Sequence, residues 1–227
     1  MLFRSTSSFG SDGLMVNKVT AAVLTDCNIS NTTPITDWTG GIVIANSTAT
    51  ISDCIVHNGY TNGVVIAGNS TVTVNRGSTY NMGLGQYYAK CGYSVVNTNT
   101  VIFNNTTTYS NTDDGFTVNS DAEVTFNGCL SYNNGNEWVS PVNYSGDGFT
   151  AHDTAIVHLN YCNGYGNHKS GAGFVNTGAG NTIYGCTFYN NYNTTLDRGT
   201  TPFYKNNGIL LHGRSEERRV GKECRSR

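Results

Sequence analysis

Hydrophobic and polar positions alternate along this chain in short runs, and the runs recur. The stretch DGFTVNSDAEVTFNGC (Asp114–Cys129) returns as DGFTAHDTAIVHLNYC (Asp147–Cys162), with eight of sixteen positions identical. Each copy opens on Asp-Gly, continues as an alternating strand, turns through polar residues, forms a second strand and ends on cysteine. Alternation with a period of two is typical of strands with one buried face. The pattern therefore predicts a repeated unit of two or three short strands.

The same template begins at eight glycines, separated by steps of 28, 22, 29, 23, 33, 25 and 35 residues. These glycines are Gly13, Gly41, Gly63, Gly92, Gly115, Gly148, Gly173 and Gly208. Repeats of this length predict a solenoid, and units without a ten-residue helical pattern exclude leucine-rich and helical repeats. We therefore expect an all-β fold, a parallel β-helix of about eight coils. Equivalent positions then stack about 4.8 Å apart, the spacing of paired strands.

Composition agrees with this fold class and narrows the partners. The chain holds 30 Asn, 30 Thr and 27 Gly, while charged residues make up only 12%. Such residues favour strands and turns over helices. The net charge of −2 argues against a nucleic-acid partner. No apolar run is long enough to span a bilayer.

The last stretch of the chain differs from the rest. Residues 214–227 (RSEERRVGKECRSR) carry 9 of the 28 charged side chains and resemble a translated sequencing adapter. We expect this segment to be non-native and disordered, with a charged natural tail as the alternative. Residues 1–213 are expected to form a β-helix fragment without a signal peptide. Because neither end shows a capping element, flanking coils or domains are expected beyond this chain.

Five cysteines occupy the same place in their repeats and are expected to face the interior. They are Cys27, Cys54, Cys129, Cys162 and Cys186, with Cys91 separate in a loop. A stack of small apolar thiols suits a core, a disulfide between adjacent coils is geometrically allowed, and a metal site would need Cys-x-x-Cys pairs that are absent. The asparagines that follow are expected to form a turn ladder: Asn58, Asn133, Asn134, Asn167, Asn190 and Asn191.

The Gly–strand–Cys-x-x-x-Asn pattern, as in CIVHN (Cys54–Asn58) and CLSYN (Cys129–Asn133), resembles the right-handed parallel β-helix proteins of the pectate-lyase superfamily. The resemblance covers residues 13 to about 213. It implies a secreted protein, extracellular or on the cell surface, with a polysaccharide as its partner. It does not determine an activity, because one fold carries many functions.

Extra length always falls after the asparagine turn and before the next glycine, so long loops are expected at one corner of the rod. All four long loops carry aromatic residues, and long loops on a rigid scaffold concentrate function. We predict that these residues bind sugar rings, with packing of the loops or a protein contact as alternatives. The predicted substrate-binding residues are Trp38, Tyr87, Tyr88, Trp138, Tyr144 and Tyr204.

Carboxylates form the second candidate site. Asp114 and Asp147 each precede a coil-opening glycine and should lie one above the other, with Asp113 beside them. Stacked carboxylates repel, and bound Ca²⁺ or a raised pKa on one of them would relieve the repulsion. The hypothesis names all three as metal ligands and Asp114 and Asp147 as catalytic residues. The alternative is that Asp-Gly is only favourable turn chemistry.

The TDDGF stretch resembles the calcium-binding Asp-Asp-Gly stretch of one pectate-lyase family. Thr150 stands where that family places its basic lysine, and Thr117 stands where a further acidic ligand is expected. The sequence thus favours a polysaccharide-interacting domain whose catalysis is undecided. One alternative is an active lyase, hydrolase or epimerase that uses Asp114 and Asp147. The other is a noncatalytic adhesin or phage tail-fibre module.

Overall fold

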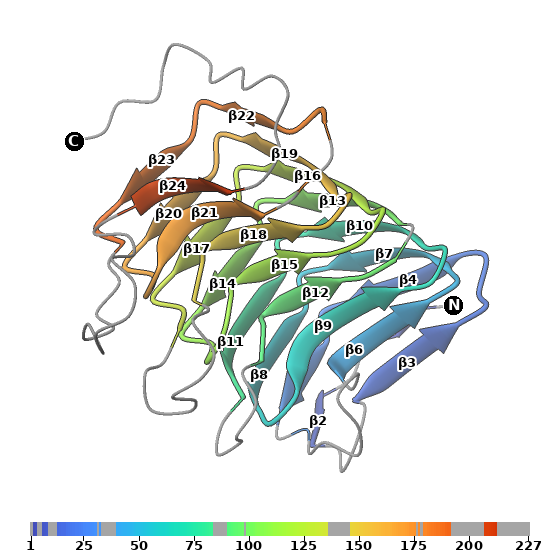
Figure 1. Ribbon diagram of the computed structural model, residues 1–227. Coiled ribbons are helices and arrows are strands. Elements are labelled where there is room, and N and C mark those ends of the chain that lie inside the picture. Colours follow the sequence, from blue (N-terminus) through green and yellow to red (C-terminus); the bar gives the residue numbers. More distant parts are fainter. Residues whose placement is uncertain are drawn as a thin grey trace.

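A computed structural model describes residues 2–3, 6–8, 13–30, 32, 40–83, 90–97, 99–135, 146–175, 177, 179–191 and 207–212. Within these ranges the chain forms strands and turns and contains no helix. The strands wind into a rod whose walls are three parallel sheets, as expected for a parallel β-helix (Figure 1). No helix long and apolar enough to cross a membrane occurs in the described ranges.

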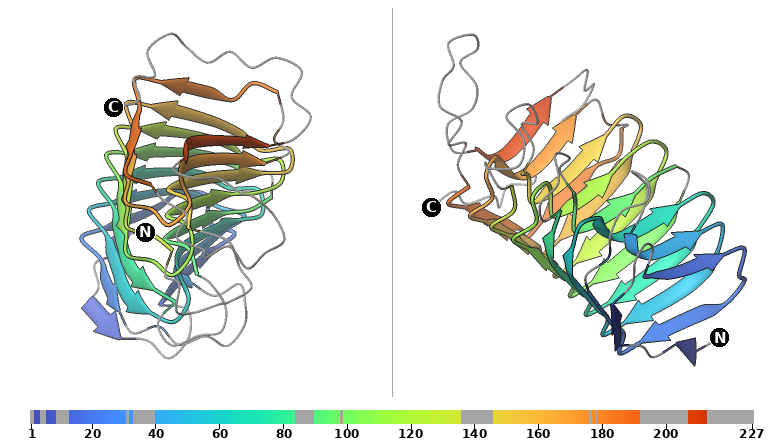
Figure 2. Two further views of the ribbon diagram at one scale, coloured as in Figure 1. Left: turned by 60° about the vertical axis from the view of Figure 1, so that its left-hand side comes forward. Right: turned by 90° about the horizontal axis from the view of Figure 1, so that it is seen from below.

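The three sheets each contain eight strands, so the expectation of about eight coils is confirmed. Sheet A consists of β1 (Leu2–Phe3), β4 (Ala22–Thr25), β7 (Thr48–Ser52), β10 (Thr71–Asn75), β13 (Thr100–Asn104), β16 (Glu123–Asn127), β19 (Ile156–Asn160) and β22 (Thr182–Tyr184). Sheet B consists of β2 (Thr6–Ser8), β5 (Asn28–Ser30), β8 (Ile55–Gly59), β11 (Ser78–Met82), β14 (Thr107–Tyr109), β17 (Leu130–Tyr132), β20 (Asn163–Tyr165) and β23 (Thr187–Tyr189). Sheet C consists of β3 (Leu14–Asn17), β6 (Gly40–Ala45), β9 (Asn62–Ala67), β12 (Tyr93–Val95), β15 (Phe116–Val118), β18 (Phe149–His152), β21 (Ser170–Val175) and β24 (Asn207–His212). The chain visits sheets C, A and B in turn, and two further views show the strands stacked along the rod (Figure 2).

Left-handed backbone at the corners explains the abundance of asparagine and glycine. At the corner from sheet A to sheet B, seven successive coils place one residue at a φ between 50° and 62°. These residues are Asp26, Asp53, Arg76, Asn105, Gly128, Tyr161 and Gly185. Glycine, asparagine and aspartate adopt this conformation at the lowest cost. The corner from sheet B to sheet C uses Asn58, Asn133 and Asn190 in the same way, as the turn ladder predicted.

The cysteines line the interior, as expected. All five equivalent cysteines are buried, and the structure joins none of them in a disulfide. The backbone N–H of Cys162 donates to the Cys186 sulfur at 3.2 Å, so adjacent thiols are in contact with the neighbouring coil. Burial raises the pKa of the Cys54 thiol, and the neighbouring Cys129 thiol together with burial raises the pKa of Cys162, which keeps these two groups neutral. The structure therefore supports a packing role for these cysteines in the core, without disulfides.

A second, buried ladder is formed by the asparagines that directly follow the left-handed residues at the corner from sheet B to sheet C. The side-chain amide of Asn111 donates to Asn134 at 2.9 Å, Asn134 to Asn167 at 3.0 Å and Asn167 to Asn191 at 3.0 Å. Each accepting oxygen also receives the backbone N–H of the preceding asparagine in the row, at 3.0–3.2 Å. Buried polar groups need such partners to be tolerated. The predicted asparagine set thus comprises left-handed corner residues and a buried amide ladder.

A row of aromatic rings runs along the outside of sheet B. His57, Tyr80, Tyr109, Tyr132, Tyr165 and Tyr189 stack with ring centroids 4.8–5.0 Å apart. Parallel strands in register impose this distance on equivalent side chains. Because each ring covers the face of the next, this row presents ring edges and hydroxyls to solvent. Its aromatic faces are used in packing along the rod.

Two coils lack the ladder cysteine, and one of these replacements has a visible steric cause. Gly77 takes the cysteine position below the buried ring of Tyr93, and a Cβ on Gly77 would lie 2.7 Å from Tyr93 Oη. The tyrosine hydroxyl therefore fills the space that a thiol occupies elsewhere in the row. Size exchanges of this kind preserve the volume of a close-packed core.

We expect Gly77→Ala to lower the free energy of unfolding by about 1–3 kcal/mol, the usual cost of overpacking. In the Tyr93→Phe background the same change should become neutral or stabilising, because the hydroxyl is gone and alanine lowers the entropy of the unfolded chain. Urea unfolding of the wild type, both single variants and the double variant measures this coupling. An equal cost of Gly77→Ala in both backgrounds would contradict the steric account.

Candidate functional site

The corner from sheet B to sheet C brings together the residues that precede the coil-opening glycines. Asn62, Cys91, Asp114, Asp147 and Ser170 follow one another along the rod in successive coils. The coil after that of Gly148 opens on Gly171 and not, as the sequence pattern predicted, on Gly173, because Phe149 pairs with Ala172. The glycines that follow these five residues are packed closely against atoms of other segments. A Cβ on Gly115, for example, would clash with Ser131 Oγ. Glycine is thus required where the backbone bends into sheet C. The side chains of the five preceding residues are all buried in this corner.

Asp114 fixes the start of the following coil. Its Oδ1 accepts the backbone N–H groups of Gly146 and Asp147, both at 2.8 Å, and its Oδ2 accepts the Thr117 hydroxyl at 3.2 Å. The side chain is buried. A buried carboxylate that accepts several hydrogen bonds is satisfied and held in one orientation. Asp114 therefore links its own coil to the coil of Asp147 through main-chain hydrogen bonds, which confirms that these two residues are neighbours in the stack.

Asp147 is neutralised from the next coil along. Its Oδ2 lies 3.0 Å from Lys169 Nζ, and its Oδ1 accepts the hydroxyl of Ser170. Burial, and then the charge of Asp114, raise the pKa of Asp147 to about 6, and Lys169 only partly opposes this shift. Burial lowers the pKa of Lys169, but the surrounding carboxylates more than compensate and leave it raised. Lys169 is thus a protonated ammonium at neutral pH.

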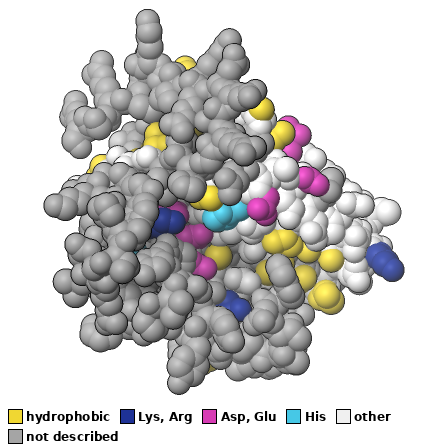
Figure 3. Space-filling view, viewed as in Figure 1, with side chains coloured by type: hydrophobic (Ala, Val, Ile, Leu, Met, Phe, Trp, Pro, Cys, Tyr) yellow, Lys and Arg dark blue, Asp and Glu magenta, His cyan; other side chains and the backbone are white. Residues whose placement is uncertain are grey.

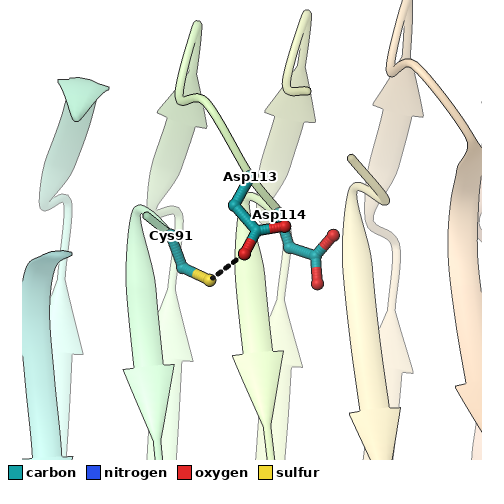
Figure 4. Close-up of side chains that lie close together, drawn as sticks. All are labelled: Cys91, Asp113 and Asp114. Carbon is teal, nitrogen blue, oxygen red and sulfur yellow. Dashed lines mark hydrogen bonds between the residues drawn. The ribbon is translucent and has the colours of Figure 1, made fainter. Parts of the chain in front are cut away.

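Cys91 and Asp113 complete the corner (Figure 4). The Cys91 thiol donates to Asp113 Oδ2 at 3.6 Å, and its sulfur lies 3.0 Å from Thr117 Oγ1. One ligand atom each of Cys91, Asp113 and Asp114 lie within 4.8 Å of one another. Burial and the two carboxylates raise the pKa of Cys91 well above its usual range, so the thiol stays protonated. It acts here as a hydrogen-bond donor.

Thr150 lies in register between Thr117 and Gly173 on neighbouring strands of sheet C. Its hydroxyl is buried and finds no hydrogen-bond partner among the residues that the structure describes. Beside it, the Asp147 carboxylate lies over the bare Cα of Gly173, where a Cβ would be 3.1 Å from Oδ2. An unsatisfied buried hydroxyl costs about 1–3 kcal/mol and marks a position where a ligand hydroxyl would gain a bond.

A space-filling view shows how charged side chains are distributed over one face of the molecule (Figure 3). Acidic, basic and histidine side chains lie near one another on the face that carries sheet C (Figure 3). His158, by contrast, belongs to the outer side of sheet A, where its Nδ1 lies 2.8 Å from the Thr182 hydroxyl. The charged corner is therefore a local cluster on one side of the rod.

The structure brings the predicted carboxylates together, but not as one set of ligands. Asp113 and Asp114 form a compact group with Cys91, whereas both oxygens of Asp147 are engaged by Lys169 and Ser170. Carboxylate oxygens suit a hard cation, and a thiol does not. Both oxygens of Asp114 are engaged as well, by the Gly146 and Asp147 N–H groups and the Thr117 hydroxyl, so Asp147 differs in being paired with a cation. Binding of Ca²⁺ at Asp113 and Asp114 therefore stays a prediction. Whether any carboxylate here is catalytic stays a prediction.

Sequence reasoning missed Cys91 and Lys169 as members of this site. Cys91 precedes a coil-opening glycine, as Asp114 and Asp147 do, and Lys169 stands one residue before that position, as Asp113 does. Aligning every coil on its glycine, with Gly171 in place of Gly173, would have placed both at this corner. The six predicted sugar-binding aromatics lie outside the described residues: Trp38, Tyr87, Tyr88, Trp138, Tyr144 and Tyr204. Residues 214–227 lie outside them as well.

Comparison with known proteins agrees with the fold. A family model described as "Right handed beta helix region" matches residues 12–188. A rhamnogalacturonan lyase is similar in structure, with a TM-score of 0.53 at 17% identity, over 76% of this chain and 51% of that chain. Pectate lyase Pel9A has a TM-score of 0.49 at 15% identity, over 77% of this chain and 57% of that one. The chain therefore spans just over half the length of each. No curated protein matches.

The raised pKa of Asp147 predicts a pH-dependent stability. Because the folded carboxyl binds its proton near pH 6 and the unfolded one near 3.8, this group destabilises the fold as the pH rises through that window. Asp147→Asn cannot titrate there. Its free energy of unfolding relative to wild type should improve by up to about 3 kcal/mol between about pH 4 and pH 7, on top of a constant loss of the Lys169 contact.

Chemical unfolding at a series of pH values, in buffer with a chelator, measures this shift. Asp53→Asn is the matched control, because Arg76 lowers the pKa of Asp53, so that its relative stability should move in the opposite direction. A difference between Asp147→Asn and wild type that does not change with pH would show that Asp147 is an ordinary carboxylate.

Proposed function

The chain belongs to the right-handed β-helix family, and on this premise we propose that it binds an acidic polysaccharide at the corner formed by Asp113, Asp114, Asp147 and Lys169. The observation that carries the proposal is the burial of charged side chains at an outer corner of the rod. Burial of charge is unfavourable unless each group is paired. Shifted pKa values beside such groups are typical of functional sites.

Lys169 indicates the charge of the ligand. Its ammonium is held on the corner by Asp147, and its side chain keeps 22% of its surface exposed. An exposed cation on a polar corner suits the carboxylate of a sugar acid. The name of the similar rhamnogalacturonan lyase states that it acts on a polysaccharide, which supports the same ligand class here.

In this proposal Asp113 and Asp114 bind a Ca²⁺ ion. Their oxygens lie close together, and hard divalent cations such as Ca²⁺ prefer carboxylates. When bound, Ca²⁺ would supply a positive charge to sugar carboxylates at the corner. The unsatisfied Thr150 hydroxyl would accept or donate a hydrogen bond to a sugar hydroxyl.

The predicted aromatic contacts belong to the same proposal. The stretches that contain Trp38, Tyr87, Trp138 and Tyr204, with their aromatic neighbours, all join sheet B to sheet C. The strands that flank each stretch therefore end and begin at the corner from sheet B to sheet C. We propose that a polysaccharide bound along this corner also contacts these aromatic residues, and the location implied for such a protein is extracellular or on the cell surface.

Binding is favoured over catalysis by the state of Lys169. A lyase needs a neutral base to remove a proton, and the carboxylates around Lys169 keep it protonated. Thr150 supplies a hydroxyl where the resembling lyases keep a basic side chain. We therefore propose a binding module, with lyase, hydrolase or epimerase activity as the alternative that the following test separates.

Calorimetry with CaCl₂ and oligogalacturonate, separately and together, tests the proposal. Wild type should bind oligogalacturonate when Ca²⁺ is present. Asp114→Asn keeps the shape of the side chain but removes its charge, and it should weaken binding by about tenfold or more, the equivalent of one charge-assisted contact. Asp153→Asn is the matched control, because Asp153 is exposed at another corner, and asparagine tolerates its φ of 60°.

Ultraviolet absorbance of the same mixtures reports an unsaturated product. Binding without absorbance supports a binding module, whereas an increase in absorbance identifies a lyase. The absence of heat in every combination would leave the Asp-Gly pairs as turn chemistry and would refute the proposed site.

A further inference from the structure

The outer side of sheet A carries a regular array that the charged corner does not involve. Strands β7, β10, β13 and β16 pair in register over five residues each. Every second residue points outward, so the strands present three straight rows. The rows are Thr48, Thr71, Thr100 and Glu123; Thr50, Thr73, Ile102 and Thr125; and Ser52, Asn75, Asn104 and Asn127. The array repeats at about 4.8 Å between strands and about 6.6 Å along them.

This face is open and almost uncharged. All twelve side chains are half-buried or exposed, and Glu123 is the one charged residue among them. At the adjoining corner Asp53 and Arg76 form an ion pair at 2.7 Å, so their charges cancel. Apart from the Glu123 carboxylate, the array therefore consists of hydroxyl, methyl and amide groups on a regular sheet.

The asparagine row is ordered before any ligand binds. Asn127 donates to Asn104 at 2.9 Å, Asn104 to Asn75 at 3.0 Å, and Asn75 to the Ser52 hydroxyl at 3.3 Å. Threonine is also restricted, because a β-branched side chain has few rotamers. Groups that are already fixed lose little entropy on binding. The face thus suits a partner with equally regular hydroxyl groups.

We propose that the outer face of β7, β10, β13 and β16 binds an uncharged polysaccharide whose chains are packed side by side in an ordered solid. A two-dimensional array of hydroxyl and amide groups matches a solid that repeats in two dimensions. The twelve residues of this face include no cationic group, which nucleic acids require. They also lack the aromatic core of a protein interface. The proposal adds a second surface to the proposed function and does not depend on the charged corner.

The size of the face sets the strength of the contact. Four strands of five residues cover roughly 300 Å², well below the 800 Å² or so that each partner buries in a stable protein interface. Binding by one copy is therefore weak, and it is best measured on a solid that offers many sites. Because Glu123 is the one charge on the face and the proposed partner is uncharged, retention should be the same in low and high salt.

Retention on microcrystalline cellulose tests the proposal. Thr73→Val combined with Thr125→Val removes two hydroxyls and keeps shape and strand propensity, so retention should fall by about thirtyfold, at roughly 1 kcal/mol for each of the two lost hydrogen bonds. Thr73→Lys combined with Thr125→Lys should abolish retention. Ser78→Val combined with Thr107→Val is the matched control, since both are half-buried outer residues of sheet B, and it should bind as wild type does.

Circular dichroism and thermal unfolding confirm that each variant is folded. Retention should be equal at about 0.05 M and about 1 M NaCl, where the Debye length shrinks to about 3 Å, and excess oligogalacturonate should not displace the protein. These two measurements separate this face from the charged corner. Three results would overturn the proposal: no retention of wild type, equal retention of the threonine variants, or thermal hysteresis in ice without retention on cellulose. The last result would assign the array to ice.

Discussion

Parallel pairing in register is the constraint on which the rest of this structure depends. Each coil places its residues directly over the equivalent residues of the coil before, at the spacing of paired strands. Favourable like-on-like contacts then propagate along the rod. Thiols lie over thiols, amides donate to amides from Asn111 to Asn191, and ring centroids repeat at 4.8–5.0 Å outside sheet B. A solenoid is stabilised by such ladders because each repeat contacts only its neighbours.

The same constraint makes charge expensive, and the charged corner shows how the fold responds. Asp114 lies directly before Asp147 in the stack, where two carboxylates would repel. Asp114 is satisfied by main-chain N–H groups, and Asp147 is satisfied by Lys169 and Ser170. Each acidic residue is therefore compensated by the next coil. Pairing with the next coil is thus a third way to relieve the repulsion between stacked carboxylates, beside a bound cation and a raised pKa. It occurs together with the raised pKa of Asp147.

The repeat made the fold, the interior cysteines and the stacking of the two aspartates predictable from sequence. Period, glycine position and cysteine position are one-dimensional properties, and stacking converts them directly into neighbours. Spacing places Lys169 at the corner only when its coil is aligned on Gly171, and the ion pair with Asp147 depends in addition on which way the lysine side chain turns, which no spacing determines. The same is true of Tyr93, whose hydroxyl occupies the cysteine position of another coil at Gly77. The residues that break a ladder are those that the repeat cannot predict.

Breaks in the ladders also divide the surface into two kinds. Where the rows continue unbroken, as on the outer side of sheet A, neighbouring side chains satisfy one another and the face is neutral and regular. Where rows change identity from coil to coil, as in Asn62, Cys91, Asp114, Asp147 and Ser170, charges accumulate and their pKa values shift. A regular face recognises a partner that itself repeats, whereas an irregular corner can recognise one chemical group. A single β-helix can therefore hold a polymer along its length and select a particular sugar at one corner, because the two tasks fall on different sides of the rod.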